Sequence, residues 1–162
     1  RSRAWLPDML GRWAESELSL LPVAVLVAGE VAPTILVAGG VVACYSFGYH
    51  VLHQAADVHF DRQAGVETFA TGFGVAGTVA VGAIATAAAT GFTLALDYPL
   101  AAVVFGGVTA FYVDVFYSVQ ETDPASASRA LAERFNIAWV ATLANGALAV
   151  AVWRHALSVW TV

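Results

Sequence analysis

The stretch Thr71–Leu96, which reads TGFGVAGTVAVGAIATAAATGFTLAL, decides the fold class of this chain. It contains no charged side chain, and a helix that spans a bilayer needs about 20 consecutive, mostly apolar residues. The whole chain has the same character, because hydrophobic residues make up 59% of its 162 positions, charged residues 12%, and the mean hydropathy is +0.73. A soluble domain carries about twice this charged fraction. We therefore interpret the chain as an integral membrane protein.

Four other stretches have the length and composition of membrane spans or come close to them. They are Leu18–Gly29 with an extension back through Trp13, Val31–Leu52, Tyr98–Val119 and Phe135–Trp153. We expect an all-α fold, a polytopic transmembrane helical bundle of about five helices that forms a single domain over residues 1–162. Between two of the spans, Asp97-Tyr98-Pro99 predicts a tight turn. Because the chain starts at Arg1 without a signal-peptide pattern, we interpret it as the carboxyl-terminal part of a longer protein.

Positive charge is unevenly distributed between the two ends of the predicted helices. With five spans, the side that holds the amino end, Asp57–Glu67 and Gln120–Arg134 carries every arginine except Arg154. Short cytoplasmic loops hold the excess of positive charge, so both polar segments are predicted to be cytoplasmic. The chain has no lysine and is rich in Ala, Val and Gly, which suggests a GC-rich or halophilic source, and we expect the chain to lie in the plasma membrane of a prokaryote. We expect no nucleic-acid partner, and the single Cys44 excludes an intramolecular disulfide framework.

The polar stretch after the second predicted span, Tyr49–Gly65, reads YHVLHQAADVHFDRQAG. If the helix continues, His53, Asp57 and Asp61 stack on one face, because they are four residues apart. Two neighbouring carboxylates repel each other, but they can share a divalent cation with a polyanion, and Mg²⁺ is the hard cation that carboxylates and phosphates hold together. Arg62 adds a forked donor suited to phosphate oxygens. The alternative is that Asp57–Glu67 is only a solvated connection.

The stretch Asp57–Gly74, DVHFDRQAGVETFATGFG, resembles the second aspartate-rich motif of the UbiA superfamily of intramembrane prenyltransferases. That motif has the pattern D-x-x-x-D-x-x-x-D-R-x-x-G, followed by a threonine and a glycine. The positions that match are Asp57, Asp61, Arg62, Gly65, Thr68 and Gly74. His53 stands where the superfamily has its first carboxylate, and the superfamily's first motif, N-D-x-x-D-x-x-x-D, is absent from this chain.

The resemblance implies a nine-helix fold, of which this chain supplies helices five to nine. It also implies a Mg²⁺-dependent transfer of an isoprenoid chain from a prenyl diphosphate to an aromatic or lipid-like acceptor. In that reaction Asp57 and Asp61 bind Mg²⁺, while Arg62 and His53 bind the diphosphate. The acceptor class stays open between a quinone-ring precursor, a tetrapyrrole carboxylate, a lipid glycerol phosphate and a carotenoid. Membrane lipid and the missing amino-terminal helices of the same protein are the other implied partners, without which the fragment is expected to be inactive.

Asp114 is a second candidate, because a carboxylate in the middle of a membrane span costs about 2.5–3.5 kcal/mol on insertion scales and is therefore rare without a function. Tyr112 and Tyr117 are possible partners for it. We expect Asp114 and Tyr49 to line a cavity, with a structural hydrogen bond as the alternative for Asp114. A different class of protein is also compatible with these residues, namely a transporter or membrane-assembly subunit in which Asp114 is an intramembrane relay and Asp57–Glu67 is only a loop.

Overall fold

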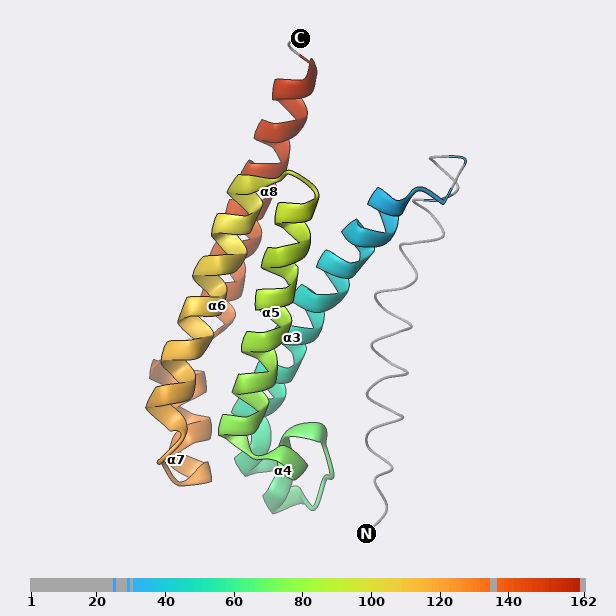
Figure 1. The fold of residues 1–162 in the computed structure, drawn as a ribbon. Helices are drawn as coiled ribbons and strands as arrows, with labels where there is room; N and C mark the ends of the chain where they lie inside the picture. Colours follow the sequence, from blue (N-terminus) through green and yellow to red (C-terminus); the bar gives the residue numbers. More distant parts are fainter. Residues whose placement is uncertain (1–24, 26–28, 30, 135–136, 161–162) are drawn as a thin grey trace.

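The computed structural model describes residues 25, 29, 31–134 and 137–160, and over these residues the fold is an all-α bundle, as predicted. Its elements are α3 (Pro33–Ala64), α4 (Phe69–Phe73), α5 (Val75–Ala95), α6 (Pro99–Val119), α7 (Pro124–Arg129), the π-helical turn η1 (Ala130–Arg134) and α8 (Ile137–Trp160). The four long helices run alongside one another, and the short helices α4 and α7 lie at the same end of the bundle (Figure 1). The predicted first span, Leu18–Gly29, lies almost entirely outside the described residues.

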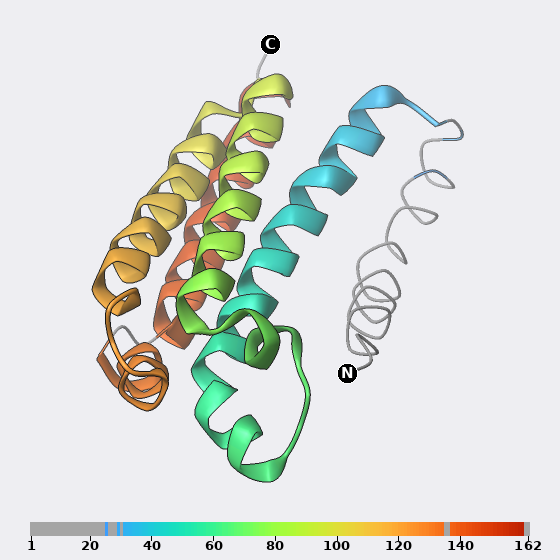
Figure 2. The same cartoon turned by 60° about the horizontal axis from the view of Figure 1, so that its bottom comes forward.

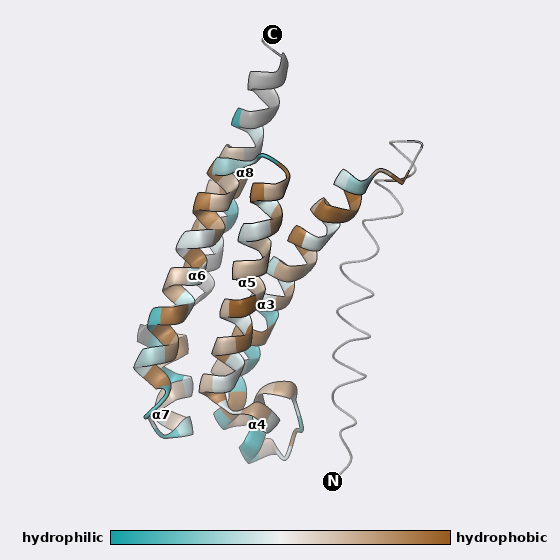
Figure 3. Ribbon diagram, viewed as in Figure 1, coloured by the Kyte–Doolittle hydropathy of each residue, from teal (hydrophilic) through white to brown (hydrophobic). Residues whose placement is uncertain are grey.

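Three of the long helices, α3, α5 and α6, are long and apolar enough to cross a membrane. In α8 the apolar stretch among the described residues is shorter, Thr142–Ala151. Apolar residues cover much of the long helices, whereas polar residues are frequent around α4 and α7 (Figure 3). The structure therefore agrees with a polytopic membrane bundle. It also places the two polar segments, which follow the predicted second and fourth spans, at one common end (Figure 1).

Helix α3 is longer than the predicted span Val31–Leu52, because it continues through the polar motif as far as Ala64. It ends in a Schellman motif, in which the N–H of Gly65 binds the carbonyl of Arg62 at 3.3 Å and the N–H of Val66 binds the carbonyl of Asp61 at 2.9 Å. Gly65 has a φ of 70°, a left-handed conformation that glycine adopts without strain. Most of the predicted connection Asp57–Glu67 is therefore helical.

The predicted span Thr71–Leu96 is divided into two helices at Gly74, whose φ is 79°. Gly74 donates its N–H to Ala70 and accepts from Thr78, so it both ends α4 and begins α5. Figure 2 shows the chain leaving the end of α3 and returning through α4 to α5. The turn predicted at Asp97-Tyr98-Pro99 is confirmed, since Asp97 has a φ of 61° and α6 begins at Pro99.

Helices α3 and α5 approach each other through two facing glycines. A Cβ on Gly48 would lie 3.1 Å from the carbonyl oxygen of Gly82, and a Cβ on Gly82 would lie 3.2 Å from that of Gly48. Small residues at such positions allow backbones in a membrane to pack closely. Around this contact, Leu52, Val79 and Tyr112 belong to one buried apolar cluster that joins α3, α5 and α6.

Candidate active site

Helix α3 carries Tyr49, His53, Asp57 and Asp61 on four successive turns, and we call these residues the α3 stripe. Because α3 is continuous to Ala64, each member lies one turn beyond the last, as the predicted register required. The rings of Tyr49 and His53 are in edge-to-face contact, with centroids 4.4 Å apart and an interplanar angle of 82°. This contact packs the imidazole against the Tyr49 ring, one helical turn before Asp57.

The residues after Asp61 hold the carboxylate end of α3 against α4. The hydroxyl of Thr68 donates to Oδ2 of Asp61 at 3.2 Å, and Thr68 also caps α4 in a reciprocal box with Thr71. Arg62 donates from Nη2 to the carbonyl oxygen of Thr71 at 3.2 Å. The motif residues thus act together locally. Gly65 reverses the chain after α3, and the side chains of Asp61 and Arg62 bind Thr68 and Thr71 in the segment that returns. Arg62 is exposed, and a guanidinium has five N–H donors, so it keeps donors for an anion.

The carboxylate of Asp57 and Nε2 of His53 are among the polar groups of the α3 stripe that have no hydrogen-bond partner in the described residues. Asp57 is exposed, and its carboxylate accepts no hydrogen bond from them. His53 is half-buried, and its Nε2 is buried and unpaired. Leaving a buried polar atom unpaired costs about 1–3 kcal/mol, so an orphaned nitrogen one helical turn from Asp57 is the kind of atom that a bound polar group would satisfy.

Helix α7 contacts the backbone of α3 through Ser128, a fully buried residue that the sequence did not single out. Its hydroxyl donates to the carbonyl of Ala55 at 3.2 Å and accepts from the N–H of His59 at 3.3 Å. These are the two peptide groups that the α-helical repeat joins, so the hydroxyl is inserted at one rung of the α3 hydrogen-bond ladder. A serine in a short polar segment carries no local signal for such a contact, since it depends on how α7 docks on α3.

The described residues do not bring together three or more His, Cys, Asp or Glu side chains that could hold a metal ion. Mg²⁺ does not require such a cage, because it is usually bound through one or two carboxylates together with waters and substrate phosphates. Asp57 and the Asp61 oxygen that Thr68 leaves free are two carboxylate donors on adjacent turns. The residues present therefore fit a Mg²⁺ ion bound jointly with a phosphate-bearing ligand.

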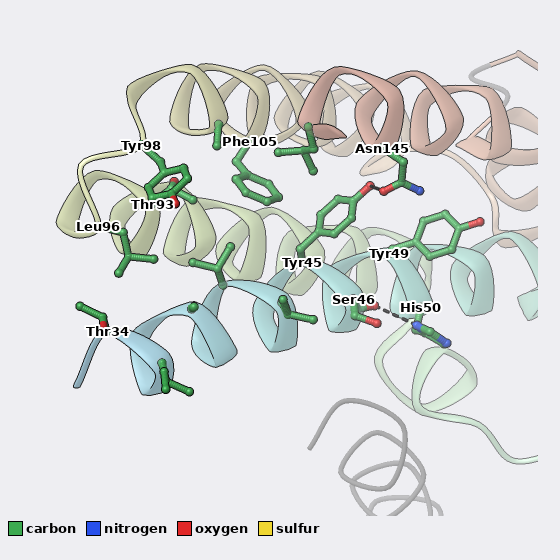
Figure 4. A pocket seen from close by; sticks show the side chains of 16 residues that line it. Thr34, Tyr45, Ser46, Tyr49, His50, Thr93, Leu96, Tyr98, Phe105 and Asn145 are labelled. Carbon is green, nitrogen blue, oxygen red and sulfur yellow. Dashed lines mark hydrogen bonds between the residues drawn. The ribbon is translucent and has the colours of Figure 1, made fainter. Parts of the chain in front are cut away.

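A groove of about 920 Å³ adjoins the stripe, and we call it the α3–α8 groove. It is lined by α3, the carboxyl-terminal end of α5, α6 and α8 (Figure 4). Ligand pockets typically measure about 300–1,000 Å³, so this groove is large enough for a lipid-like molecule. At the end farthest from the stripe it is lined by apolar and aromatic groups, among them Leu96, Tyr98 and Phe105.

Polar groups line the other end of the α3–α8 groove. Tyr49 and His50 lie there, and His50 Nδ1 is 2.9 Å from the carbonyl oxygen of Ser46. Between the two ends, the hydroxyl of Tyr45 on α3 donates to Oδ1 of Asn145 on α8 at 2.8 Å. Tyr49 belongs to both the groove and the stripe, so the two form one continuous surface along α3.

Asp114 lies elsewhere, on the exposed side of α6, and it is not among the residues that line the α3–α8 groove. The buried side of α6 carries Tyr112, which is 3% exposed, while Tyr117 is 66% exposed. The Asp114 carboxylate accepts no hydrogen bond from the described residues; its backbone carbonyl accepts one from Ser118 at 2.9 Å. α6 turns Tyr112 inward and Asp114 outward because residues two apart on a helix do not share a face.

The structure thus brings His53, Asp57, Asp61 and Arg62 together at one end of α3, and it adds Tyr45, Asn145 and Ser128, which sequence reasoning missed. The last three act through tertiary contacts between distant segments, so a motif search has no pattern by which to find them. No family model, no curated protein and no solved structure matches this chain.

Proposed function

We propose that this chain is part of an intramembrane prenyltransferase that moves an isoprenoid chain from a prenyl diphosphate to a hydrophobic acceptor. The observation that carries the proposal is the continuity of the α3 stripe with the α3–α8 groove through Tyr49. One helix then presents carboxylates and an arginine at one end and an apolar groove at the other. That combination suits an elongated amphiphile with an anionic head and a long apolar tail.

The dimensions of α3 support an extended ligand. Asp57 lies eight residues beyond Tyr49, which is about 12 Å along a helix axis. In the other direction the groove reaches Thr34, which is about 22 Å from Tyr49 at the helical rise. An anionic head beside Asp57 can therefore continue into a tail that follows the groove through most of the membrane.

The chemistry proposed for the head region rests on the α3 stripe and Arg62. Asp57 and Asp61 would hold Mg²⁺, which neutralises charge on a departing diphosphate when it is bound. Arg62 binds diphosphate oxygens with the donors that Thr71 leaves free. His53 hydrogen-bonds a substrate oxygen through its unpaired Nε2. The apolar groove holds the tail and keeps water from the allylic carbon as the C–O bond to the diphosphate breaks.

The proposed setting is the plasma membrane of a prokaryote, with the stripe at the cytoplasmic surface. The described end of the bundle that carries α4 and α7 holds Arg62 and Arg129, while Arg154 lies in the last turns of α8. This distribution agrees with the excess of positive charge on cytoplasmic segments. Among acceptors, the quinone-ring, tetrapyrrole, glycerol-lipid and carotenoid classes all remain candidates.

Turnover in membranes that contain the full-length protein tests the proposal. Diphosphate release and prenyl incorporation are measured with geranylgeranyl diphosphate, Mg²⁺ and a panel of acceptors. We expect Asp57→Asn/Asp61→Asn to lose at least about 100-fold in turnover, because removing groups that stabilise developing charge costs about 10²–10³-fold. Asp114→Asn is the matched control, since it removes a carboxylate from the same membrane domain but outside the stripe, and it should retain activity.

Two results would overturn the proposal. One is a well-folded wild-type protein that turns over no prenyl diphosphate with any acceptor. The other is a double variant as active as the wild type. The exposed carboxylate of Asp114 within an apolar helix favours a transporter as the second candidate. Ion flux into proteoliposomes that requires Asp114 and survives the loss of Asp57 and Asp61 would establish that second function instead.

A further inference from the structure

A hydrogen bond crosses the α3–α8 groove, the 2.8 Å contact from the Tyr45 hydroxyl to Asn145 Oδ1. Tyr45 comes from α3 and Asn145 from α8, so the contact joins opposite walls of the groove. Figure 4 shows the Tyr45 ring reaching across to Asn145, with Phe105 and Tyr98 on one side and Tyr49 and His50 on the other. The ring is also held from the side, because it packs edge-on against Phe105 with centroids 5.1 Å apart.

This polar contact, in which Tyr45 is half-buried and Asn145 is exposed, is favoured where lipid rather than water surrounds it. A hydroxyl or an amide that loses its partner among hydrocarbon groups finds no water to replace it. The described residues offer Tyr45 and Asn145 each other as partners, so the closed arrangement is the low-energy one. A tyrosine has only two side-chain torsions, so the crossing ring is also a comparatively rigid barrier.

We infer that the Tyr45–Asn145 hydrogen bond determines the length of the isoprenoid chain that the α3–α8 groove accepts. The inference rests on the proposed function, which places the diphosphate beside Asp57. Tyr45 lies twelve residues before Asp57, about 18 Å along the helix. Thr34 lies eleven residues farther, about another 16 Å. A short chain fits between the stripe and the barrier, whereas a long chain has to break the hydrogen bond to enter the outer part of the groove.

Two variants break this contact from opposite sides. Tyr45→Phe keeps the ring and removes only the hydroxyl, and Asn145→Leu keeps a similar volume and removes the acceptor. A single hydrogen bond corresponds to about a five- to tenfold change in an equilibrium constant, so we expect the preference for octaprenyl over farnesyl diphosphate to rise by that factor in each variant. The double variant should equal the single ones, because all three lose the same contact.

The experiment has a kinetic arm and a binding arm. The kinetic arm measures kcat/KM for both diphosphates in membranes that contain the full-length protein. The binding arm measures the affinity of the purified protein for uncharged farnesol and octaprenol by displacement of a fluorescent isoprenoid alcohol. Tyr117→Phe is the matched control, because it removes a tyrosine hydroxyl from the exposed side of α6, away from the groove. Its preference should equal that of the wild type. Most of the change in the two barrier variants should appear in KM and in alcohol affinity, because the barrier acts on binding of the tail.

The binding arm separates the barrier from the proposed chemistry. If the wild type turns over prenyl diphosphates but neither barrier variant shifts the length preference or the alcohol affinities, the barrier inference is overturned and the prenyltransferase proposal stands. If no prenyl diphosphate is turned over, the proposed function is overturned, and the alcohol affinities still decide the barrier. A shift toward octaprenol in both variants and not in Tyr117→Phe supports it, and equal affinities in all proteins reject it.

Discussion

The packing of α3 against α5 gives a quantitative prediction for Gly48→Ala. The added Cβ would lie 3.1 Å from the carbonyl oxygen of Gly82 and 3.2 Å from Cγ2 of Thr86, both on α5. The nearer atom belongs to the backbone and cannot rotate away, so the two helices have to separate. Overpacking of this kind typically costs about 1–3 kcal/mol, whereas alanine gains about 1 kcal/mol over glycine in a helix interior. The net expectation is a loss of about 0–2 kcal/mol.

Gly91→Ala is the matched control, because it makes the same change inside α5 where no atom lies within 4 Å of the added Cβ. It should stabilise the protein by about 1 kcal/mol from helix propensity alone. The two variants therefore differ by about 1–3 kcal/mol, which cancels the shared propensity gain and isolates the packing cost. The assay is reversible unfolding in mixed micelles with increasing dodecyl sulfate, followed by far-ultraviolet circular dichroism.

A reciprocal variant strengthens the test. Gly82→Ala places its Cβ 3.2 Å from the carbonyl oxygen of Gly48, so it should also destabilise the bundle. Because both substitutions push apart the same pair of helices, the double variant should cost less than the sum of the two. Equal stabilities for Gly48→Ala and Gly91→Ala would refute the conclusion that α3 and α5 are in close contact at these glycines.

Two further predictions concern α7. Ser128→Ala should lower the free energy of unfolding by only about 1 kcal/mol, because the N–H of His59 and the carbonyl of Ala55 can then bind each other along α3. Amide exchange in α7 should nevertheless accelerate, because α7 loses its hydrogen bonds to α3. Unchanged exchange would contradict the role of the hydroxyl. Hydrogen bonds from Ser126 hold the pKa of Asp123, which caps α7, below its ordinary value of 3.8. The carboxylate therefore stabilises α7 above that value, and the contribution is lost as the pH falls through the lowered pKa. Amide protection factors in α7, corrected for the intrinsic exchange rate at each pH from 6 to 3, should fall at the acid end in the wild type and show a weaker pH dependence in Asp123→Asn; identical profiles would count against this cap.

Hydropathy predicted the helix ends of this chain well where the change from apolar to polar residues coincides with the end of the helix. For α6, the prediction Tyr98–Val119 differs from the structure by one residue, because Asp97 and Pro99 mark the start of the helix and polar residues follow its end. For α3 the same criterion stopped too early, at Leu52. Hydropathy reports the change from apolar to polar residues, whereas the helix ends where Gly65 supplies a left-handed conformation. The glycine in the motif was therefore the better marker of the helix end.

At Gly74 hydropathy made the opposite error, because it predicted one long helix where the structure has two shorter ones. The stretch Thr71–Leu96 is apolar on both sides of Gly74, so composition alone predicts one helix. The structure has two, since Thr68 begins α4 with a capping box and Gly74 takes a positive φ. A threonine six residues before a glycine gives no periodic signal, and the separate α4 segment is held to α3 by the contacts of Thr68 with Asp61 and of Thr71 with Arg62.

The members of the α3 stripe could be predicted because they depend only on the register of one helix, whereas the contacts of Tyr45 and Ser128 could not. Tyr45 binds a residue 100 positions away, and Ser128 binds residues 69 and 73 positions away. Long-range partners of this kind are determined by the packing of helices. Between α3 and α5, for example, the small residues Gly48 and Gly82 permit the close approach of the two backbones.

The position of Ser128 has a consequence for how the candidate site is held. Because α3 is one continuous helix, the wall of the groove and the two carboxylates move together unless the helix bends between them. Helices bend most readily where a side chain inserts into the hydrogen-bond ladder, and in α3 the Ser128 hydroxyl occupies such a rung between His53 and Asp61. The docking of α7 is therefore tied to α3 between the groove and the carboxylate end. In the proposed enzyme, this docking would align the anionic head of the substrate with the groove that holds its tail.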